Sequence, residues 1–219
     1  MYQDLDYFLY EFGTPTSSKS VPSTIIEKYR TRLPAALIEF WNTYGLCSFN
    51  NGLLWFVNPD DYEEQLESWI GDTPIMEFDA FHVIARNAFG ELYLWGKKSG
   101  YSYEIAAPMG WLVQKKGHEG VIASKGEDAA FGQFLACSLS KKIIGMKSTN
   151  NTPLFDECIQ RFGPLKEDEC FGFVPALFAG GENTIDHIQK LNIFTHLSIL
   201  AQMADRQIMD TNALIKTAF

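Results

Sequence analysis

The sequence is poor in the residues and patterns that mark several large classes of protein. Only four cysteines occur among its 219 residues, and none forms a C-x-x-C pair, so the thiols are expected to stay reduced. No uncharged apolar run approaches the roughly 20 residues that a membrane span needs. Two acids, Asp4 and Asp6, stand where a secretory signal would be basic. We therefore expect a cytoplasmic protein without membrane contact.

Sequence patterns of common catalytic sites are missing as well. The chain contains no G-x-S-x-G, H-E-x-x-H, G-x-x-x-x-G-K-[ST] or G-x-G-x-x-G pattern, and its four histidines are scattered. The neighbouring acids Asp60, Asp61, Glu63 and Glu64 could serve acid–base or metal chemistry, but no nucleophile or basic clamp stands near them. We predict no enzyme, no metal, no cofactor and no small-molecule substrate. A small carboxylate- or metal-dependent hydrolase remains an alternative.

The most informative absence is that of basic residues from one long segment. No Lys or Arg stands between Arg32 and Arg86, and the nine acids of this segment equal the whole net charge of −9. Nucleic-acid binding needs clustered Lys and Arg, so no direct contact with nucleic acid is predicted. An acidic field attracts basic partners, although it can also be a solvated face that keeps the protein in solution. The nine acids are Glu39, Asp60, Asp61, Glu63, Glu64, Glu67, Asp72, Glu77 and Asp79.

What is present indicates a folded protein with a large core, because 46% of the residues are apolar and 14% are aromatic. Residues 22–45 are typical of two helices separated at Leu33-Pro34. After a short strand at 53–57, Asn58 can cap another helix that has Pro59 at its first position. Carboxylates in its first turns favour the helix dipole. Its predicted buried stripe consists of Tyr62, Leu66, Trp69 and Ile70.

The middle of the chain is rich in β-strand patterns. A hairpin is predicted from 80–86 and 91–95 around a turn that ends in Gly90. Further short strands are predicted at 102–106, 111–114 and 120–123, and helices at 127–139, from 153 to 162, at 185–191 and at 196–203. The predicted fold class is α+β, an antiparallel β-meander flanked by helices, with a smaller helical or mixed C-terminal lobe. The predicted units are 1–140, a linker or edge segment 141–152, and 153–219.

Two groups of residues resemble known domains. The N-terminal half resembles the GAD-like domain, and the C-terminal residues resemble the immunity-type domain that often follows it. The first group is Phe8, Phe12, Gly13, Pro15, Val21-Pro22, Tyr29, Leu33-Pro34, Phe40-Trp41, Tyr44-Gly45, Gly52, Trp55, Asn58-Pro59, Tyr62, Trp69, Ile84-Ala85-Arg86, Phe89-Gly90-Glu91-Leu92 and Trp95-Gly96. The second group is Phe162-Gly163-Pro164-Leu165, Asp168-Glu169, Gly172-Phe173, Pro175-Ala176-Leu177, Gly180-Gly181, His196-Leu197 and Ile199-Leu200.

The resemblance implies an immunity protein of the type VI secretion system, which neutralises an antibacterial DNase toxin by stoichiometric inhibition in the cytoplasm. A nuclease presents basic residues to phosphates, so an acidic surface would complement it. Tight binding would also need buried aromatic anchors. A SUKH-like immunity or scaffold protein that binds a non-nuclease partner is the main alternative. The predicted partner-binding residues are Asp60, Asp61, Glu63, Glu64, Glu67, Asp72, Glu77, Asp79, Tyr62 and Trp69.

Overall fold

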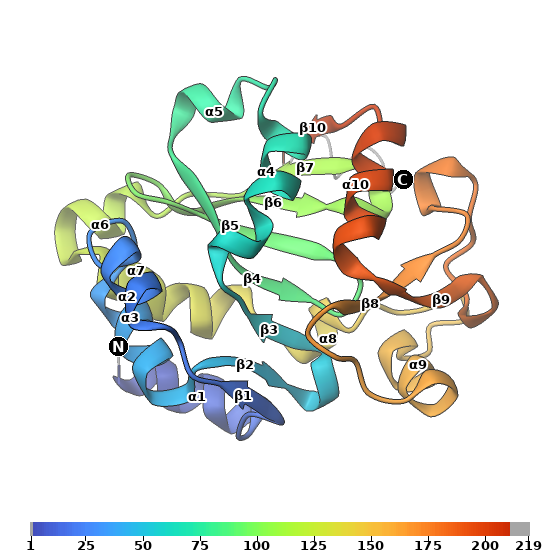
Figure 1. The fold of residues 1–219 in the computed structure, drawn as a ribbon, viewed down its shortest axis with the longest axis horizontal. Coiled ribbons are helices and arrows are strands. Elements are labelled where there is room, and N and C mark those ends of the chain that lie inside the picture. Colours follow the sequence, from blue (N-terminus) through green and yellow to red (C-terminus); the bar gives the residue numbers. More distant parts are fainter. Residues whose placement is uncertain (1, 211–219) are drawn as a thin grey trace.

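The computed structural model describes residues 2–210 and is dominated by one large sheet between two helical layers (Figure 1). The strands are β1 (Ser17–Lys19), β2 (Leu46–Phe49), β3 (Leu54–Phe56), β4 (Phe81–Asn87), β5 (Glu91–Gly96), β6 (Gly100–Ala106), β7 (Trp111–Gln114), β8 (Glu169–Phe173), β9 (Ile188–Asn192) and β10 (Gln207–Met209). The α-helices are α1 (Tyr2–Phe12), α2 (Ser23–Tyr29), α3 (Ala35–Tyr44), α4 (Glu63–Ile70), α5 (Ile75–Phe78), α6 (Glu119–Lys125), α7 (Glu127–Gln133), α8 (Lys141–Ile144), α9 (Leu154–Phe162) and α10 (Ile193–Met203).

The large sheet has eight strands in the order β1-β2-β3-β4-β5-β6-β7-β10. Strands β1 to β7 are neighbours in chain order, and every pair among them is antiparallel. Strand β10 then adds in parallel to β7, with Gln207 beside Trp111. Strands β8 and β9 form a separate antiparallel pair. The predicted α+β meander with a smaller mixed C-terminal region is therefore confirmed.

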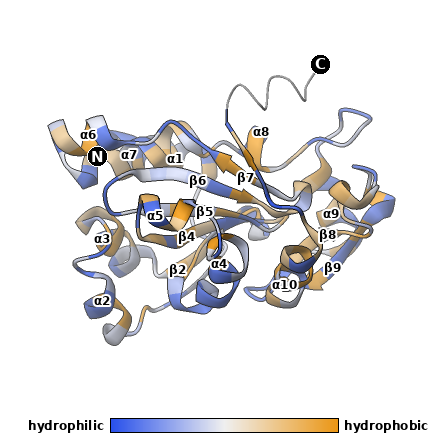
Figure 2. Cartoon of the chain, turned by 90° about the horizontal axis from the view of Figure 1, so that it is seen from above, coloured by the Kyte–Doolittle hydropathy of each residue, from blue (hydrophilic) through white to orange (hydrophobic). Residues whose placement is uncertain are grey.

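The two faces of the sheet are covered by different helices. In Figure 2, α2, α4 and α10 lie on one side of the sheet, and α1, α6 and α7 lie on the other. On the first side, the Trp69 indole donates a hydrogen bond of 3.2 Å to the carbonyl of Leu197, which joins α4 to α10. On the second side, the rings of Tyr93 and Tyr101 pack against Phe134 in the π-helical turn Phe134–Ser138. Both layers bury large aromatic side chains, which supply most of the packing energy of such a core.

Two predicted elements are wrong. Residues 120–123 were predicted as a strand but lie in α6, which turns Val121 and Ile122 toward the core and ends at Gly126 with φ of 87°. Residues 185–191 were predicted as a helix, because apolar residues three apart at 185, 188 and 191 imitate a helical stripe. They instead form a 3-10 turn followed by β9, whose backbone pairs with β8. Pairing with a distant strand overrides the local pattern.

The C-terminal residues share a continuous hydrophobic core with the rest of the chain. Arg86 of β4 is fully buried, stacks on the Trp55 ring at 4.7 Å and donates a 2.8 Å hydrogen bond to the carbonyl of Glu167. The amide of Phe171 bonds to the carbonyl of Ala88 at 2.8 Å. These contacts tie residues 165–173 to the sheet. The unit boundaries at 140 and 153 remain a prediction. Within residues 2–210, no helix is long and apolar enough to cross a membrane.

Candidate functional site

The acidic segment starts at the 3-10 turn Pro59–Tyr62 and continues into α4. The side-chain oxygen of Asn58 accepts a hydrogen bond of 3.2 Å from the amide of Asp60, and Pro59 holds the first position of the turn. This confirms the predicted cap. The predicted buried stripe of Tyr62, Leu66, Trp69 and Ile70 is also confirmed. The turn and the stripe together fix which acids of the segment can face outward.

Two predicted aromatic contact residues point into the core. Tyr62 is only 2% exposed and its ring packs on Phe194 of α10, with 5.1 Å between ring centroids. Trp69 is fully buried under the same helix. Both residues hold α4 against α10, because a large apolar ring gains more by leaving water than by staying on a surface. Neither can serve as a surface anchor, which corrects the prediction for these two residues.

Asp79 is also withdrawn from the surface. It is 5% exposed, and its Oδ2 accepts hydrogen bonds from the amides of Lys98 and Ser99, at 2.8 and 2.9 Å, and from the Ser99 hydroxyl at 2.9 Å. The carboxylate thereby satisfies the backbone of the turn between β5 and β6. Its role is structural, because a buried charge is tolerated only when hydrogen bonds surround it.

Asp60 and Glu63 share one lysine from α2. Lys28 Nζ lies 2.6 Å from Asp60 and 3.0 Å from Glu63, and the Tyr29 hydroxyl donates a further hydrogen bond to Asp60. Burial alone would raise the pKa of Asp60, but the hydrogen bonds from Lys28 and Tyr29 lower it overall. Asp60 is therefore engaged within the protein, whereas the side chain of Glu63 is still 61% exposed.

The other acids of the segment lie further out. Asp72 pairs with Arg206 through two hydrogen bonds of 2.6 and 2.8 Å, which lower the pKa of its carboxyl group. Glu77 is exposed on α5, and Glu39 is exposed on α3. The nine acids therefore do not form one surface. The pairing with Arg206 was beyond sequence reasoning, because the two residues stand far apart in the chain.

Four acids do share one surface, which we call the acidic ridge: Asp61, Glu63, Glu64 and Glu67. All four are exposed on the 3-10 turn and α4. Asp61, Glu64 and Glu67 make no ion pair with any residue in the described part of the chain. The carboxylates of Glu64 and Glu67 are open to an outside cation, whereas that of Asp61 is partly desolvated and accepts a hydrogen bond of 3.0 Å from the Asn58 side chain.

Beside the acidic ridge, α10 presents exposed apolar side chains. Ile199 and Met203, the apolar strip, are 48% and 58% exposed. They stand four residues apart and therefore lie on the same side of α10, opposite the buried face. Glu67 and Ser68 of α4 line a shallow groove together with Ala201 and Gln202 of α10, so the two helices are neighbours, and the apolar strip lies outside this groove. The predictions missed this strip, although its i, i+4 spacing in a predicted helix could have indicated it.

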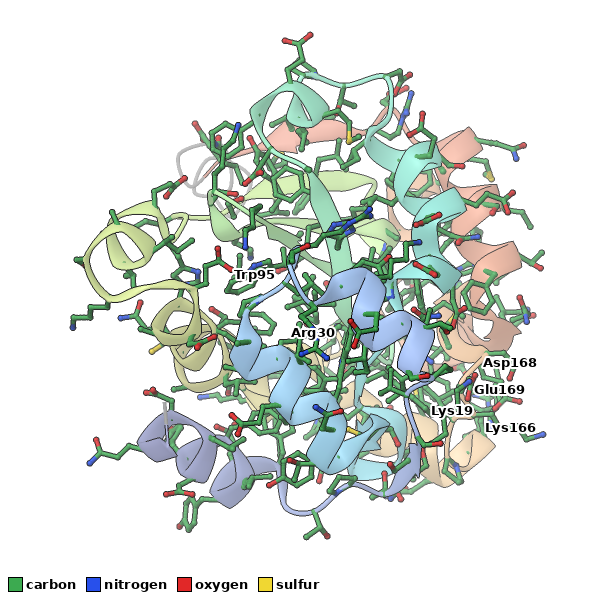
Figure 3. All side chains as sticks on the ribbon, turned by 60° about the vertical axis from the view of Figure 1, so that its left-hand side comes forward. Lys19, Arg30, Trp95, Lys166, Asp168 and Glu169 are labelled. Carbon is green, nitrogen blue, oxygen red and sulfur yellow. The ribbon has the colours of Figure 1, made fainter. Side chains whose placement is uncertain are left out.

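A pocket opens between the N-terminal ends of α4 and α10, and we call it the end pocket. Rings of Trp55, Tyr62 and Phe194 form its walls, and Asp61 lines its edge. An ion pair of 2.5 Å between Lys19 and Glu167 closes one side, where Lys19 stands beside Lys166, Asp168 and Glu169 (Figure 3). Burial raises the pKa of Asp61 above its usual range, so this carboxylate would gain from a cationic neighbour.

The described residues contain no group of three His, Cys, Asp or Glu side chains placed to hold a metal ion. Three of the four cysteines are buried, and burial raises the pKa of Cys47, Cys158 and Cys170 to about 12. The fourth, Cys137, is exposed. The exposed chemistry of the α4–α10 face is therefore that of carboxylates and apolar side chains.

Comparison with known proteins gives two domain matches and a likeness of fold. Residues 3–109 match the GAD-like domain, and residues 128–204 match the C-terminal domain of the T6SS immunity protein Tdi1. The structure is similar to the crystal structure of Atu4351 from Agrobacterium tumefaciens, with a TM-score of 0.80 and 19% sequence identity. That likeness covers 96% of this chain and 93% of the other. No curated protein matches the sequence.

The chain is thus an α+β protein with a GAD-like domain in its N-terminal half. Its residues 128–204 are similar to the C-terminal domain of the T6SS immunity protein Tdi1. The two resemblances drawn from the sequence are confirmed. The acidic ridge lies in the GAD-like match, whereas the apolar strip lies in the immunity-protein match, so the α4–α10 face combines residues of both.

Proposed function

We propose that this protein neutralises a cognate DNase toxin of the type VI secretion system by forming a stoichiometric complex in the cytoplasm, without catalysis. The match to the immunity-protein domain supports binding to a toxin effector. The observation that supports a nuclease is the acidic ridge, because an enzyme that cuts DNA must present Lys and Arg to phosphates. Three carboxylates of this ridge have no ion pair among the described residues and can complement such a surface.

The proposed contact surface is the acidic ridge together with the apolar strip and the end pocket. Charges on a ridge accelerate encounter and orient the partner, but exposed pairs add little affinity by themselves. The apolar strip supplies the affinity that exposed charges do not, since Ile199 and Met203 can be desolvated in a complex. The end pocket holds only about 30 Å³, so an Arg or Lys side chain of the toxin would lie over its mouth, against the Phe194 ring, and pair with Asp61.

Not all ten predicted partner-binding residues belong to this contact surface. Asp60 and Asp72 are engaged by Lys28 and Arg206, and we place them at the rim of the surface with Glu77. Asp79, Tyr62 and Trp69 support the surface from within. This arrangement agrees with the usual anatomy of interfaces, in which a desolvated apolar centre is surrounded by polar residues.

The direct test is to add the purified protein in increasing amounts to the nuclease effector encoded beside its gene. The quantity measured is the rate of DNA cleavage. Inhibition should be complete at one protein per toxin, and raising the salt concentration should slow the association rate. Cells that make the toxin should survive when they also make this protein. A complex that fails to form at low salt, or survival without inhibition of DNA cleavage, would contradict the proposal.

A matched pair of variants tests the surface. Glu64→Lys with Glu67→Lys should reduce the association rate by about tenfold or more at low salt. The control, Asp6→Lys with Glu119→Lys, makes the same change in net charge at exposed positions of α1 and α6. It should reduce the rate much less. Equal losses in both variants would show that only net charge matters, and the α4–α10 face would then be the wrong surface.

A further inference from the structure

A second cluster of carboxylates lies on the opposite face of the sheet, and it lines a cavity of about 350 Å³. The cavity lies between strands β5 and β6, the π-helical turn and α8. Its floor is polar and partly buried, and the isoleucines 143 and 144 contribute an apolar wall. A cavity of this size and mixed character suits a small organic ligand. It belongs neither to the acidic ridge nor to the proposed toxin surface.

The cavity is lined by two carboxylates and two lysines, Lys115 and Lys116, and only Lys115 forms an ion pair with one of the carboxylates. Glu104 accepts a hydrogen bond of 2.5 Å from the Tyr101 hydroxyl and pairs with Lys115 at 3.0 Å. Glu91 accepts a hydrogen bond of 2.5 Å from the side-chain nitrogen Nδ2 of Asn87. It has no ion pair with any residue the structure describes. Glu91 is therefore the carboxylate of the cavity without an ion-pair partner among the described residues.

The feature that most favours a ligand site is the buried hydroxyl group of Tyr93. Tyr93 lines the cavity and is only 2% exposed, and its hydroxyl lies near the Asn87 side chain without forming a hydrogen bond of normal geometry. The neighbouring amide of Asn87 is already used, because its nitrogen donates to Glu91 and to the carbonyl of Ile144. A buried hydroxyl without a partner is destabilising. A polar group bound in the cavity would satisfy it.

The protonation of the groups around Glu91 also favours a cationic ligand. Burial and then the charge of Glu104 raise the pKa of Glu91 to about 8. Glu91 therefore holds a proton near neutral pH. Burial lowers the pKa of His118, which leaves its ring neutral, and its Nδ1 accepts from the Tyr101 amide. The other titratable groups that line the cavity are Tyr93, Tyr101, Glu104, Lys115, Lys116 and Cys137.

We propose that this cavity binds a small organic cation of the alkylguanidinium or alkylammonium class. Its head group would donate hydrogen bonds to Glu91, Glu104 and the Tyr93 hydroxyl, and its alkyl part would lie on the isoleucine wall. A metal ion fits less well, because the described residues include no third carboxylate, histidine or thiolate in a coordinating position. Binding displaces the proton from Glu91, so it strengthens as pH rises.

The test is calorimetric titration of the full chain with n-propylguanidinium at pH 7, in two buffers that differ in ionisation enthalpy. Saturable 1:1 binding should release close to one proton at pH 7 and close to none at pH 9.5. The same titration with n-propylammonium shows which head group the cavity prefers. The neutral isostere N-propylurea should not bind. Absence of saturable binding by both cations, binding without proton release at pH 7, or equal binding of the urea would overturn the proposal.

Two substitutions with opposite expected effects separate a binding site from a structural cluster. Tyr93→Phe removes only the unpartnered hydroxyl, so it should weaken binding about tenfold while the melting temperature stays constant or rises. Lys115→Gln removes the competing internal cation and should tighten binding. Lys98→Gln, at an exposed position outside the cavity, is the control and should leave binding unchanged. Unaltered affinity in Tyr93→Phe, or weaker binding in Lys115→Gln, would contradict the assignment.

Discussion

Two pairs of glutamates, one on each side of the large sheet, show how surroundings decide what an acid does. Glu64 and Glu67 stand on the exposed side of α4 and have no ion pair among the described residues. Glu91 and Glu104 are drawn into a cavity and have one lysine between them. The exposed pair interacts only weakly through water, whereas Glu91 of the enclosed pair holds a proton near neutral pH. Net charge counted along a sequence therefore does not locate the acids that act on a partner.

The largest effect should come from the enclosed pair, as a dependence of stability on pH. Unfolded Glu91 loses its proton near its ordinary pKa of 4.5, whereas folded Glu91 keeps it until about 8. Between these values the native state binds more protons than the unfolded state, so stability falls as pH rises, by up to roughly 4 kcal/mol. Urea unfolding at intervals from pH 4.5 to 9 measures this fall.

Glu91→Gln should remove most of the fall, because the amide cannot ionise. Its stability should exceed that of the wild type above pH 8 and differ little from it near pH 5. Glu64→Gln is the matched control and should retain the wild-type slope. An unchanged slope in Glu91→Gln would show that the carboxyl group of Glu91 is solvated and that the contrast between the two faces is wrong.

A smaller effect separates a buried acid from an exposed one within the acidic segment itself. Asp79→Ala leaves the amides of Lys98 and Ser99 without an acceptor, so it should lower the free energy of unfolding by about 3 kcal/mol. Glu77→Ala, two residues earlier and exposed, should change it by less than about 0.5 kcal/mol. Chemical denaturation of both variants provides the comparison. Similar values for the two would mean that Asp79 does not support the turn between β5 and β6.

The sequence predicted the elements whose signals are local. The hairpin of β4 and β5 follows from apolar runs on both sides of a turn at Gly90, and the start of the acidic helix follows from Asn58-Pro59. Strand β1 carries no such signal, because its three residues are exposed and it exists only through pairing with β2. Strand β10 likewise depends on β7. Edge strands and pairings between distant segments could not be predicted from local pattern.

The candidate site was predictable only in part for the same reason. The acidic segment was identified from the sequence. Whether each of its carboxylates is paired, buried or exposed depends on residues elsewhere in the chain. Lys28 engages Asp60, Arg206 engages Asp72, and the turn at Ser99 encloses Asp79. Along α4, by contrast, helical periodicity alone separates the buried stripe from the outward-facing acids. Periodicity thus predicts exposure, whereas ion pairing needs the tertiary structure.

The smallest effect sharpens the comparison from the exposed side. Glu67→Gln removes a carboxylate that stands beyond the first turn of α4, three residues from Glu64 and four from Glu63, which should stabilise the protein by about 0.2–0.5 kcal/mol at low salt. Because the repulsion acts through water, the gain should disappear at about 1 M salt. Asp6→Asn on α1 serves as the control for loss of an exposed acid. If Glu67→Gln destabilised the protein by more than about 1 kcal/mol, this carboxylate would have a structural role within the protein, and the acidic ridge would not be a surface free to bind a partner.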